Sequence, residues 1–392
     1  MYEGNFAQTD GKRLQAGECV NMRPVSIYVH VPFCMSKCVY CDFASYPNRL
    51  NDAKVYFETL WKEIAAQKDA LHDCEIQTVF FGGGTPTIVC ADSIVRTLEV
   101  LSSFAEIKPH AEITIEGNPG TLQPEKLKAY RSAGVNRLSL GVQSMSDAHL
   151  RFLGRIHTAQ DVHEAVKMAR VCGFDNLNLD LIYDLPNQTL EDWQETLRAA
   201  VQLQPEHISA YSLIVEEGTP LYDRVARGEC RVPGEETCIE MQRTATRMLS
   251  EAGYARYEIS NYAKKGFECR HNLTYWQRGE YMGFGCAAHS MFQNKRYANP
   301  RDLNAYLSGH WHIQEETLNR EDALEETLML GLRTCAGISL RDWQRQFGTA
   351  LEKNKTVQKL ISAGLMQVDA KRLWLTERGM EVQDAVVLAL LE

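Results

Sequence analysis

Short apolar runs alternate with longer segments of helical periodicity between residues 25 and 255. The runs are rich in β-branched and aromatic residues and end in Gly, Pro or polar residues, a pattern typical of buried strands. They predict strands at 26–31, 78–81, 112–116, 137–142, 176–182 and 207–214. Apolar residues at helical spacing predict the intervening helices at 53–69, 93–103, 124–133, 159–172, 190–203 and 235–252.

This alternation predicts an α/β fold with a parallel sheet and right-handed crossover connections. Six βα units favour a partial (β/α)6 barrel of the TIM type over a closed barrel of eight units. A doubly wound open sheet is the alternative architecture.

The pattern changes near residue 255, and the chain is predicted to have four parts. Segment 1–24 precedes the barrel, which spans 25–255, and segment 256–303 is rich in Tyr, Phe, Trp and Gly and predicts strands and loops at the barrel edge. Segment 304–392 predicts helices at 321–332, 339–347, 353–364 and 377–390 with a hairpin at 366–375. These elements indicate a mainly helical, winged-helix-like domain. Its wing offers only Lys371 and Arg372, so a packing or docking role is favoured over DNA reading.

Composition narrows the class of protein. The net charge of -9 argues against a general nucleic-acid binder, which needs clustered Lys and Arg. No apolar stretch approaches the length of a membrane span, and the first residues contain no apolar signal-peptide region. The 12 cysteines are scattered and often lie inside apolar runs, which indicates reduced thiols and a cytoplasmic location.

Each predicted strand runs into a polar or Gly-rich cluster at its carboxyl end. In order, the clusters are CMSKCVYC, GGGTP, EGNPG, GVQS, DLIYDLP and EEGTP. Any one of them could be a simple turn. Because the carboxyl ends of parallel strands meet at one rim of a barrel, their repeated position predicts a shared site there.

Three cysteines, Cys34, Cys38 and Cys41, follow the first predicted strand within one short loop. Three thiolates can hold three irons of a [4Fe-4S] cluster and leave the fourth iron open to another ligand. A zinc site with His30 as fourth ligand is the alternative. The spacing alone leaves the choice open. The GGGTP turn is equally ambiguous, since its glycines suit a tight turn or a close approach of a ligand.

The motif CX3CX2C followed by Asp42 and Phe43, together with Gly83, Gly84 and Thr85, resembles the radical S-adenosylmethionine (SAM) superfamily. The resemblance implies that Cys34, Cys38 and Cys41 ligate a [4Fe-4S] cluster and that Gly83–Thr85 contact the SAM amino group. It extends over nearly the whole chain to the branch of oxygen-independent coproporphyrinogen III dehydrogenases (oxidases) and HemW-type haem chaperones. By this likeness the remaining SAM contacts are Tyr28, Tyr40, Glu116, Gln143, Arg155 and Asp180. The reaction implied is reductive cleavage of SAM to a 5′-deoxyadenosyl radical.

Two features favour the chaperone type within that branch. The dehydrogenases resemble CX3CX2CXC, whereas this chain has Phe43 at the last position. Residues 271–276 resemble the chaperones' HNxxYW motif, which implies His271 as a haem ligand, with Cys269 as the nearest competitor. The resemblance therefore implies a carrier that delivers haem to recipient haemoproteins such as respiratory enzymes, with an electron donor and peripheral contact with membrane-bound recipients. A coproporphyrinogen III oxidase, or another radical SAM enzyme acting on a tetrapyrrole, is the alternative.

Some positions depart from the family pattern. Met35 stands where Pro is usual, Asp184 where Gly is usual, and Cys286–Ala287 where Pro-Gly is usual. None of these changes removes a predicted cluster or SAM contact. Cys286, close to His289 in sequence, is a second place where metal or haem could bind.

Overall fold

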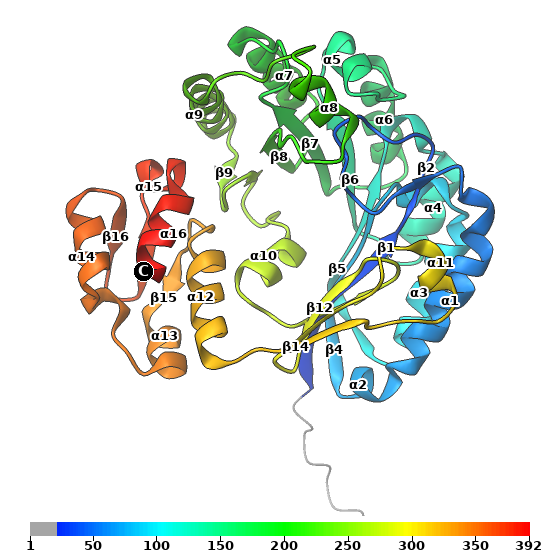
Figure 1. Ribbon diagram of the computed structural model, residues 1–392. Helices are drawn as coiled ribbons and strands as arrows, with labels where there is room; N and C mark the ends of the chain where they lie inside the picture. Colours follow the sequence, from blue (N-terminus) through cyan, green and yellow to red (C-terminus); the bar gives the residue numbers. More distant parts are fainter. Residues whose placement is uncertain (1–21) are drawn as a thin grey trace, which may run out of the picture.

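The computed structural model describes residues 22–392, so the predicted segment 1–24 lies almost entirely outside the described residues. Six parallel strands form a curved sheet in the order β1-β4-β5-β6-β7-β8 (Figure 1). Their bounds are Arg23–Val31, Cys74–Gly83, Glu106–Gly117, Arg137–Gln143, Leu177–Tyr183 and His207–Ser212. Because the spatial order follows the chain without reversal, the partial barrel is confirmed and the doubly wound alternative is wrong.

Helices cover the outer face of this arc (Figure 1). Their apolar sides pack on the sheet, as shown by fully buried Trp193, whose ring lies against Tyr183 of β7 with centroids 5.3 Å apart. Capping boxes at Thr158 and Thr189 start two of them. The covering helices are α1 (Ala53–Ala66), α3 (Ala91–Ser102), α4 (Pro124–Ser132), α6 (Ala159–Val171), α7 (Leu190–Gln202) and α9 (Glu235–Glu251). Short helices α2 (Lys68–His72), α5 (Asp147–Phe152) and α8 (Pro220–Ala226) lie in connections and were not predicted.

The aromatic-rich segment extends the sheet at both edges. β11 (Tyr281–Phe284) pairs in parallel with β1, and β12 (His289–Phe292), β13 (Lys295–Ala298) and β14 (Gln314–Thr317) continue antiparallel. At the other edge β10 (Asn261–Ala263) pairs with β8, followed by β9 (Ala255–Arg256). Helix α11 (Leu303–Leu307) follows β13, and both α11 and β14 lie past residue 303, the predicted end of the aromatic-rich segment, apart from Leu303 itself.

Helix α10 (Arg270–Trp276) was not predicted and lies on the inner side of the arc (Figure 1). Thr274 contacts Ser26 of β1 at 2.9 Å between hydroxyl oxygens. The first turn is held by the Glu112 carboxylate of β5, which accepts from the main-chain N–H groups of Arg270 and His271 at 3.0 Å each. A carboxylate at this end also complements the helix dipole. Helix α10 therefore fills space inside the barrel, below the carboxyl ends of the strands. It is called the plug from here on.

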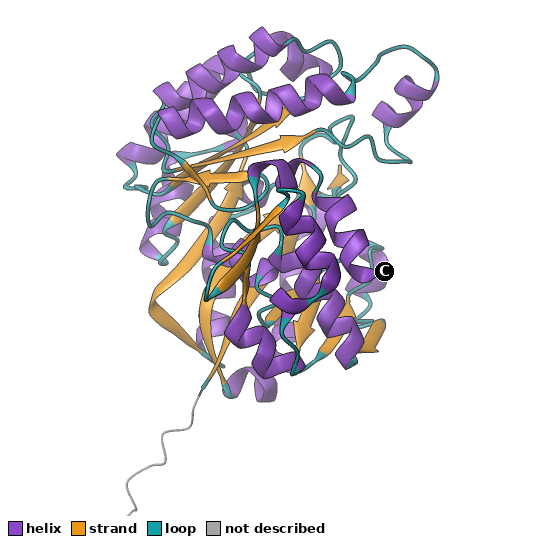
Figure 2. Cartoon of the chain, turned by 90° about the vertical axis from the view of Figure 1, so that its left-hand side faces the viewer, coloured by secondary structure: helices purple, strands orange, loops and turns teal. Residues whose placement is uncertain are grey.

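The C-terminal residues form a mainly helical, winged-helix-like unit on the open side of the arc, facing the viewer in Figure 2. It has its own hydrophobic cluster, which includes Trp343, Phe347 and Leu373. Its helices are α12 (Arg320–Gly331), α13 (Leu340–Phe347), α14 (Lys355–Ser362), α15 (Glu377–Glu381) and α16 (Gln383–Leu391), and its sheet is β15 (Ile338–Ser339), β17 (Arg372–Leu375) and β16 (Met366–Val368). The domain boundaries given above stay predictions. Within residues 22–392 no helix has both the length and the apolar character needed to cross a membrane.

Candidate cofactor-binding site

A cavity of about 480 Å³ opens at the carboxyl ends of the six parallel strands. This volume lies within the range usual for small-molecule sites. All the site residues predicted from sequence line it except Tyr28 and His271. The predicted residues that line it are Cys34, Cys38, Tyr40, Cys41, Gly83, Gly84, Thr85, Glu116, Gln143, Arg155 and Asp180.

The three cysteines come from one loop, closed by pairing of β2 (Phe33–Cys34) with β3 (Tyr46–Pro47). The Cys41 N–H donates to the Cys38 carbonyl at 3.2 Å, which tightens the loop. The Cys34 thiol lies 3.7 Å from the Thr85 hydroxyl of the glycine-rich turn. Burial raises the pKa of Cys34 and of Cys41. A bound cation is what would hold such thiols as thiolates.

The geometry of His30 bears on the zinc alternative. Its Nε2 is 2.8 Å from the Ala44 carbonyl and its Nδ1 is 3.0 Å from the Tyr28 hydroxyl, so both ring nitrogens are engaged. Among residues 22–392 no three His, Cys, Asp or Glu side chains converge on a position for a single metal ion. The three thiols line one cavity, where each could bind one iron of a cluster.

The glycine-rich turn is packed against the cysteine loop. A Cβ at Gly84 would lie 2.4 Å from the Phe33 carbonyl oxygen, and one at Gly83, where φ is +108°, would lie 2.5 Å from the His30 ring. The N–H groups of Gly83, Gly84 and Thr85 donate to the Glu116 carboxylate and to the carbonyls of Val31 and Phe33, at 2.7–3.1 Å. The glycines are therefore required by packing. A ligand ammonium group approaching here would bond to carbonyl oxygens, because an ammonium group only donates hydrogen bonds.

Two carboxylates line the cavity from β5 and β7, the strands on either side of β6. Burial, and then the charge of Asp180, raise the pKa of Glu116 to about 8. Asp180 is oriented by the Ser139 hydroxyl and the Asn178 amide, each donating at 2.8 Å. The pair offers acceptor oxygens suited to hydroxyl or ammonium groups of a ligand.

Arg155 lies at the cavity wall, where some of its guanidinium nitrogens have hydrogen-bond partners and one does not. One terminal nitrogen donates to the Gly141 carbonyl at 2.6 Å, and the other lies 3.5 Å from the Cys38 sulfur. The Nε atom is buried and has no hydrogen-bond partner within the described chain. A carboxylate would satisfy such a donor.

Gln143 lies at an irregularity in the pairing of two strands. The register of β6 against β7 shifts between Gly141 and Gln143, and Gln143 has φ +66°. Bulges of this kind redirect side chains at barrel rims. Asn118 also lines the cavity, and its buried Oδ1 has no partner within residues 22–392. Sequence analysis missed Asn118, although it had singled out the EGNPG cluster that contains it.

Tyr28 lies below the cavity wall rather than on it. Its ring stacks on Phe80 with centroids 6.2 Å apart, and its hydroxyl contacts His30. Burial raises its pKa above the usual value for tyrosine. In this structure Tyr28 contacts His30, and the His30 ring packs against the glycine-rich turn at Gly83.

His271 is enclosed on the inner side of the barrel, away from the cavity lining. Its ring nitrogens lie 2.7 Å from the Thr78 hydroxyl and 2.7 Å from the Tyr275 hydroxyl, and the residue is 1% exposed. Burial, and then nearby Arg137, lower its pKa to about 3, so the ring is neutral. Iron ligation by His271 would require one of these hydrogen bonds to break.

The other thiols proposed as competitors are also enclosed. Cys269 is buried with its sulfur 3.5 Å from a Glu112 carboxylate oxygen. Cys286 is buried against the carbonyls of Pro300 and Arg301, at 3.2 and 3.0 Å, whereas His289 is exposed. The pair of Cys286 and His289 therefore does not form a second metal or haem site in this structure.

Comparisons with known proteins agree with this architecture. The Radical SAM superfamily matches residues 28–200, and the HemN C-terminal domain matches residues 318–382. A protein of Lactococcus lactis named "Heme chaperone HemW" is 34% identical over 93% of this chain and 96% of its own length. The chain belongs to the HemW family. Family members of the same name in Synechocystis and Bacillus subtilis are 37% and 34% identical, over 92% and 90% of this chain and 89% and 96% of their own.

The family's fold is also seen in a more distant solved structure. Coproporphyrinogen III oxidase (HemN) from Escherichia coli superposes with a TM-score of 0.82 at 23% identity, over 94% of this chain and 91% of that one. At this identity the likeness concerns the fold alone. It extends through the C-terminal unit as well as the barrel.

The departures from the family pattern fall on special backbone positions. Asp184 has φ +66° and Ala287 has φ +60°, conformations that glycine adopts without strain. Asp tolerates this region better than most residues. Cys286 keeps a main-chain N–H that donates to the Tyr56 hydroxyl at 3.1 Å, which proline would lack.

Proposed function

We propose that this protein is a haem chaperone of the radical SAM type, which binds a [4Fe-4S] cluster, SAM and haem and delivers haem to haemoproteins. The observation that carries the proposal is the match to proteins named "Heme chaperone HemW" at 34–37% identity over about nine tenths of the chain or more.

The cavity chemistry supports the cofactor part of this proposal. Cys34, Cys38 and Cys41 would ligate the cluster, and the unpartnered Nε of Arg155 suits the SAM carboxylate. Glu116 and Asp180 would accept from ammonium or hydroxyl groups. The rest of SAM would be contacted by Gly83, Gly84, Thr85, Gln143 and Tyr40. Tyr28 would act indirectly, through its contact with His30. When bound, the cluster and SAM together supply one-electron reductive chemistry, for which an electron donor is required.

The second part of the proposal concerns haem and the proteins that receive it. The resemblance implies His271 as the haem ligand, but its buried ring, hydrogen-bonded at both nitrogens, argues against that role in this structure. The recipients are haemoproteins, including respiratory enzymes reached at the membrane periphery. The cytoplasmic location rests on the scattered cysteines, none of which is in a disulfide among residues 22–392.

Anaerobic reconstitution tests the proposal. We expect about four irons and four sulfides per chain, stoichiometric haem, transfer of that haem to an apo-haemoprotein, and no protoporphyrinogen from coproporphyrinogen III. Cys34→Ala and Cys41→Ala should lose the cluster, whereas Cys90→Ala, at an exposed cysteine outside the cavity lining, should keep it. A zinc-only protein, or efficient decarboxylation, would contradict the proposal.

A further inference from the structure

Large apolar side chains are exposed at the mouth of the cavity. Phe43 and Ile214 are each 68% exposed and line the cavity together with Tyr211, which is 38% exposed. Exposure of several such groups around one opening is unusual for a surface that binds nothing. Phe43 follows β1 and Ile214 follows β8, so they belong to loops of the first and last of the six parallel strands. The apolar mouth therefore draws on both sides of the arc.

Positive charge lies beside this apolar surface. Lys37 lines the cavity, and its ammonium group makes one hydrogen bond, to the Phe43 carbonyl at 3.3 Å. Arg301 donates to the Asp42 carbonyl at 2.6 Å and lies 3.4 Å from the Asp42 carboxylate. Glu216 is an opposing charge on the same lining. An ammonium group with donors to spare suits an acidic substituent on an otherwise apolar ligand.

The HNxxYW segment lacks such a free surface. The His271 ring is stacked on Phe80, with centroids 5.0 Å apart, in addition to its two hydrogen bonds. Tyr275 packs edge-on against Tyr281 at 4.6 Å, and Arg333 lies over the Trp276 ring at 5.1 Å. Every aromatic group of the motif is thus used in packing α10 between the sheet and the C-terminal unit.

We propose that haem docks at the mouth of the cavity, its macrocycle against Phe43 and Ile214 and a propionate near Lys37, rather than on His271. This inference rests on the proposed haem-chaperone function and names the site for its cargo. Apolar contact with the ring face supplies the affinity, so iron ligation by the protein is secondary. Haem held here would lie next to the cluster and SAM site.

Haem titration into the reconstituted full chain tests the location. Phe43→Ser/Ile214→Ser should weaken haem binding at least tenfold, since two large apolar contacts are lost. Val171→Ser, which alters a 77% exposed side chain at the end of α6, should not change it. His271→Gln should keep haem affinity within threefold, with circular dichroism showing that the chain is folded. Iron-free protoporphyrin IX should bind within a few fold of haem.

Several outcomes would overturn the inference. One is a double variant that binds haem as the wild type does, and another is a folded His271→Gln variant that loses haem while the double variant keeps it. A double variant that loses SAM but retains haem would assign Phe43 and Ile214 to covering SAM. A wild-type chain that binds no haem would overturn the proposed function too, whereas the first two outcomes would leave that function standing.

Discussion

At the scale of single residues, burial rather than residue type decides how the cavity groups behave. Glu116 and Asp180 are both carboxylic acids lining the cavity, yet only Asp180 has two side-chain donors, Ser139 and Asn178, each at 2.8 Å. Glu116 receives one N–H, from Gly83 at 3.1 Å, and its pKa is raised to about 8. Hydrogen bonds to a carboxylate favour its charged form, and burial disfavours it. Glu116 is therefore the group whose charge responds to a cationic ligand.

We expect the advantage of the wild type over Glu116→Gln in SAM affinity to grow about tenfold from pH 7 to pH 9. About nine tenths of the Glu116 carboxyl groups are protonated at pH 7, the ionised form attracts the cationic ligand, and the comparison removes the titration of the SAM amino group itself. Isothermal titration across this range measures the effect. Glu116→Gln should bind SAM more weakly and lose the part of the pH dependence that Glu116 contributes. Glu216→Gln, an exposed acid on the same lining, should keep it. A pH dependence unchanged in Glu116→Gln would refute this role.

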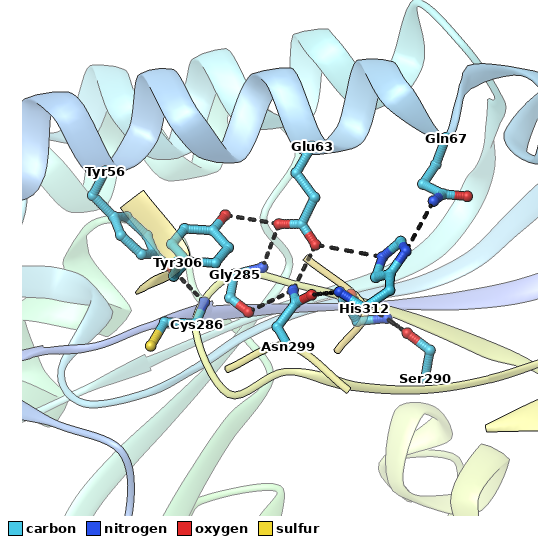
Figure 3. Close-up of polar contacts among 10 residues, drawn as sticks. Tyr56, Glu63, Gln67, Gly285, Cys286, Ser290, Asn299, Tyr306 and His312 are labelled. Atoms are coloured by element: carbon cyan, nitrogen blue, oxygen red, sulfur yellow. Dashed lines mark hydrogen bonds and ion pairs between the residues drawn. The ribbon is translucent and has the colours of Figure 1, made fainter. Parts of the chain in front are cut away.

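At the scale of elements, a buried carboxylate joins α1 to the sheet extension (Figure 3). Glu63 is fully buried and accepts from Asn299, Tyr306 and the Gly285 N–H at 2.6, 2.7 and 2.9 Å. Next to it, Tyr56 of the same helix donates to the His30 carbonyl at 2.6 Å. The joint thus reaches the end of β1, where the cysteine loop begins.

The protonation state of Glu63 should contribute to the free energy of unfolding. Burial raises the pKa of Glu63 to about 7 from 4.5, so its contribution is present at low pH and is lost as pH rises from 4.5 to 7, by about 3 kcal/mol. Nearby His312, 3.9 Å away, has a pKa lowered by burial and acts in the opposite direction. Tyr56, Tyr306 and Cys286 have raised pKa values and stay neutral here.

Comparison with Glu63→Gln isolates the contribution of Glu63. Urea unfolding at pH 5 and pH 8 should show that the wild type loses more stability than Glu63→Gln over this interval. Glu58→Gln, at an exposed position on α1, should follow the wild type. Parallel pH profiles for all three proteins would show that Glu63 does not titrate in this way.

At the scale of the whole molecule, few polar links fasten the C-terminal unit to the barrel. Glu326 of α12 accepts from Arg278, just after α10, at 2.8 Å and from Arg296 of β13 at 2.5 Å. The Cys335 N–H donates to the Tyr257 carbonyl at 3.0 Å. Because α10 lies between the unit and the sheet, these links also hold the plug inside the barrel.

Removing the Glu326 carboxylate should therefore loosen the plug as well as the unit. Glu326→Ala leaves the largely buried Arg278 unpaired and should lower the free energy of unfolding by about 3 kcal/mol. Hydrogen exchange should increase in α10 and α12 together. Glu325→Ala, at the exposed neighbouring position, should change stability by less than about 0.5 kcal/mol. Exchange that rises in α12 alone would show that the plug is held independently.

The strand periodicity was enough to predict the six βα units and the rim that carries the site, whereas most of the individual lining residues were implied by the resemblance to the radical SAM superfamily. The βα units follow from local sequence patterns, and the rim follows from the parallel order of the strands, so both can be predicted from one sequence. The short α10 was missed because seven residues rich in aromatics carry little helical periodicity, and its first turn depends on Glu112, 158 residues earlier.

Tertiary structure alone decided which polar groups are free. His30 and His271 look like metal ligands in the sequence, but folding brings hydroxyl and carbonyl partners from distant segments to their ring nitrogens. Asn118 looks like an ordinary turn residue and Arg155 was named only through the family resemblance, yet both keep unpartnered buried atoms at the cavity. A sequence determines which groups a chain possesses. Whether each group is already satisfied depends on contacts between residues far apart in the chain, which only the folded structure specifies.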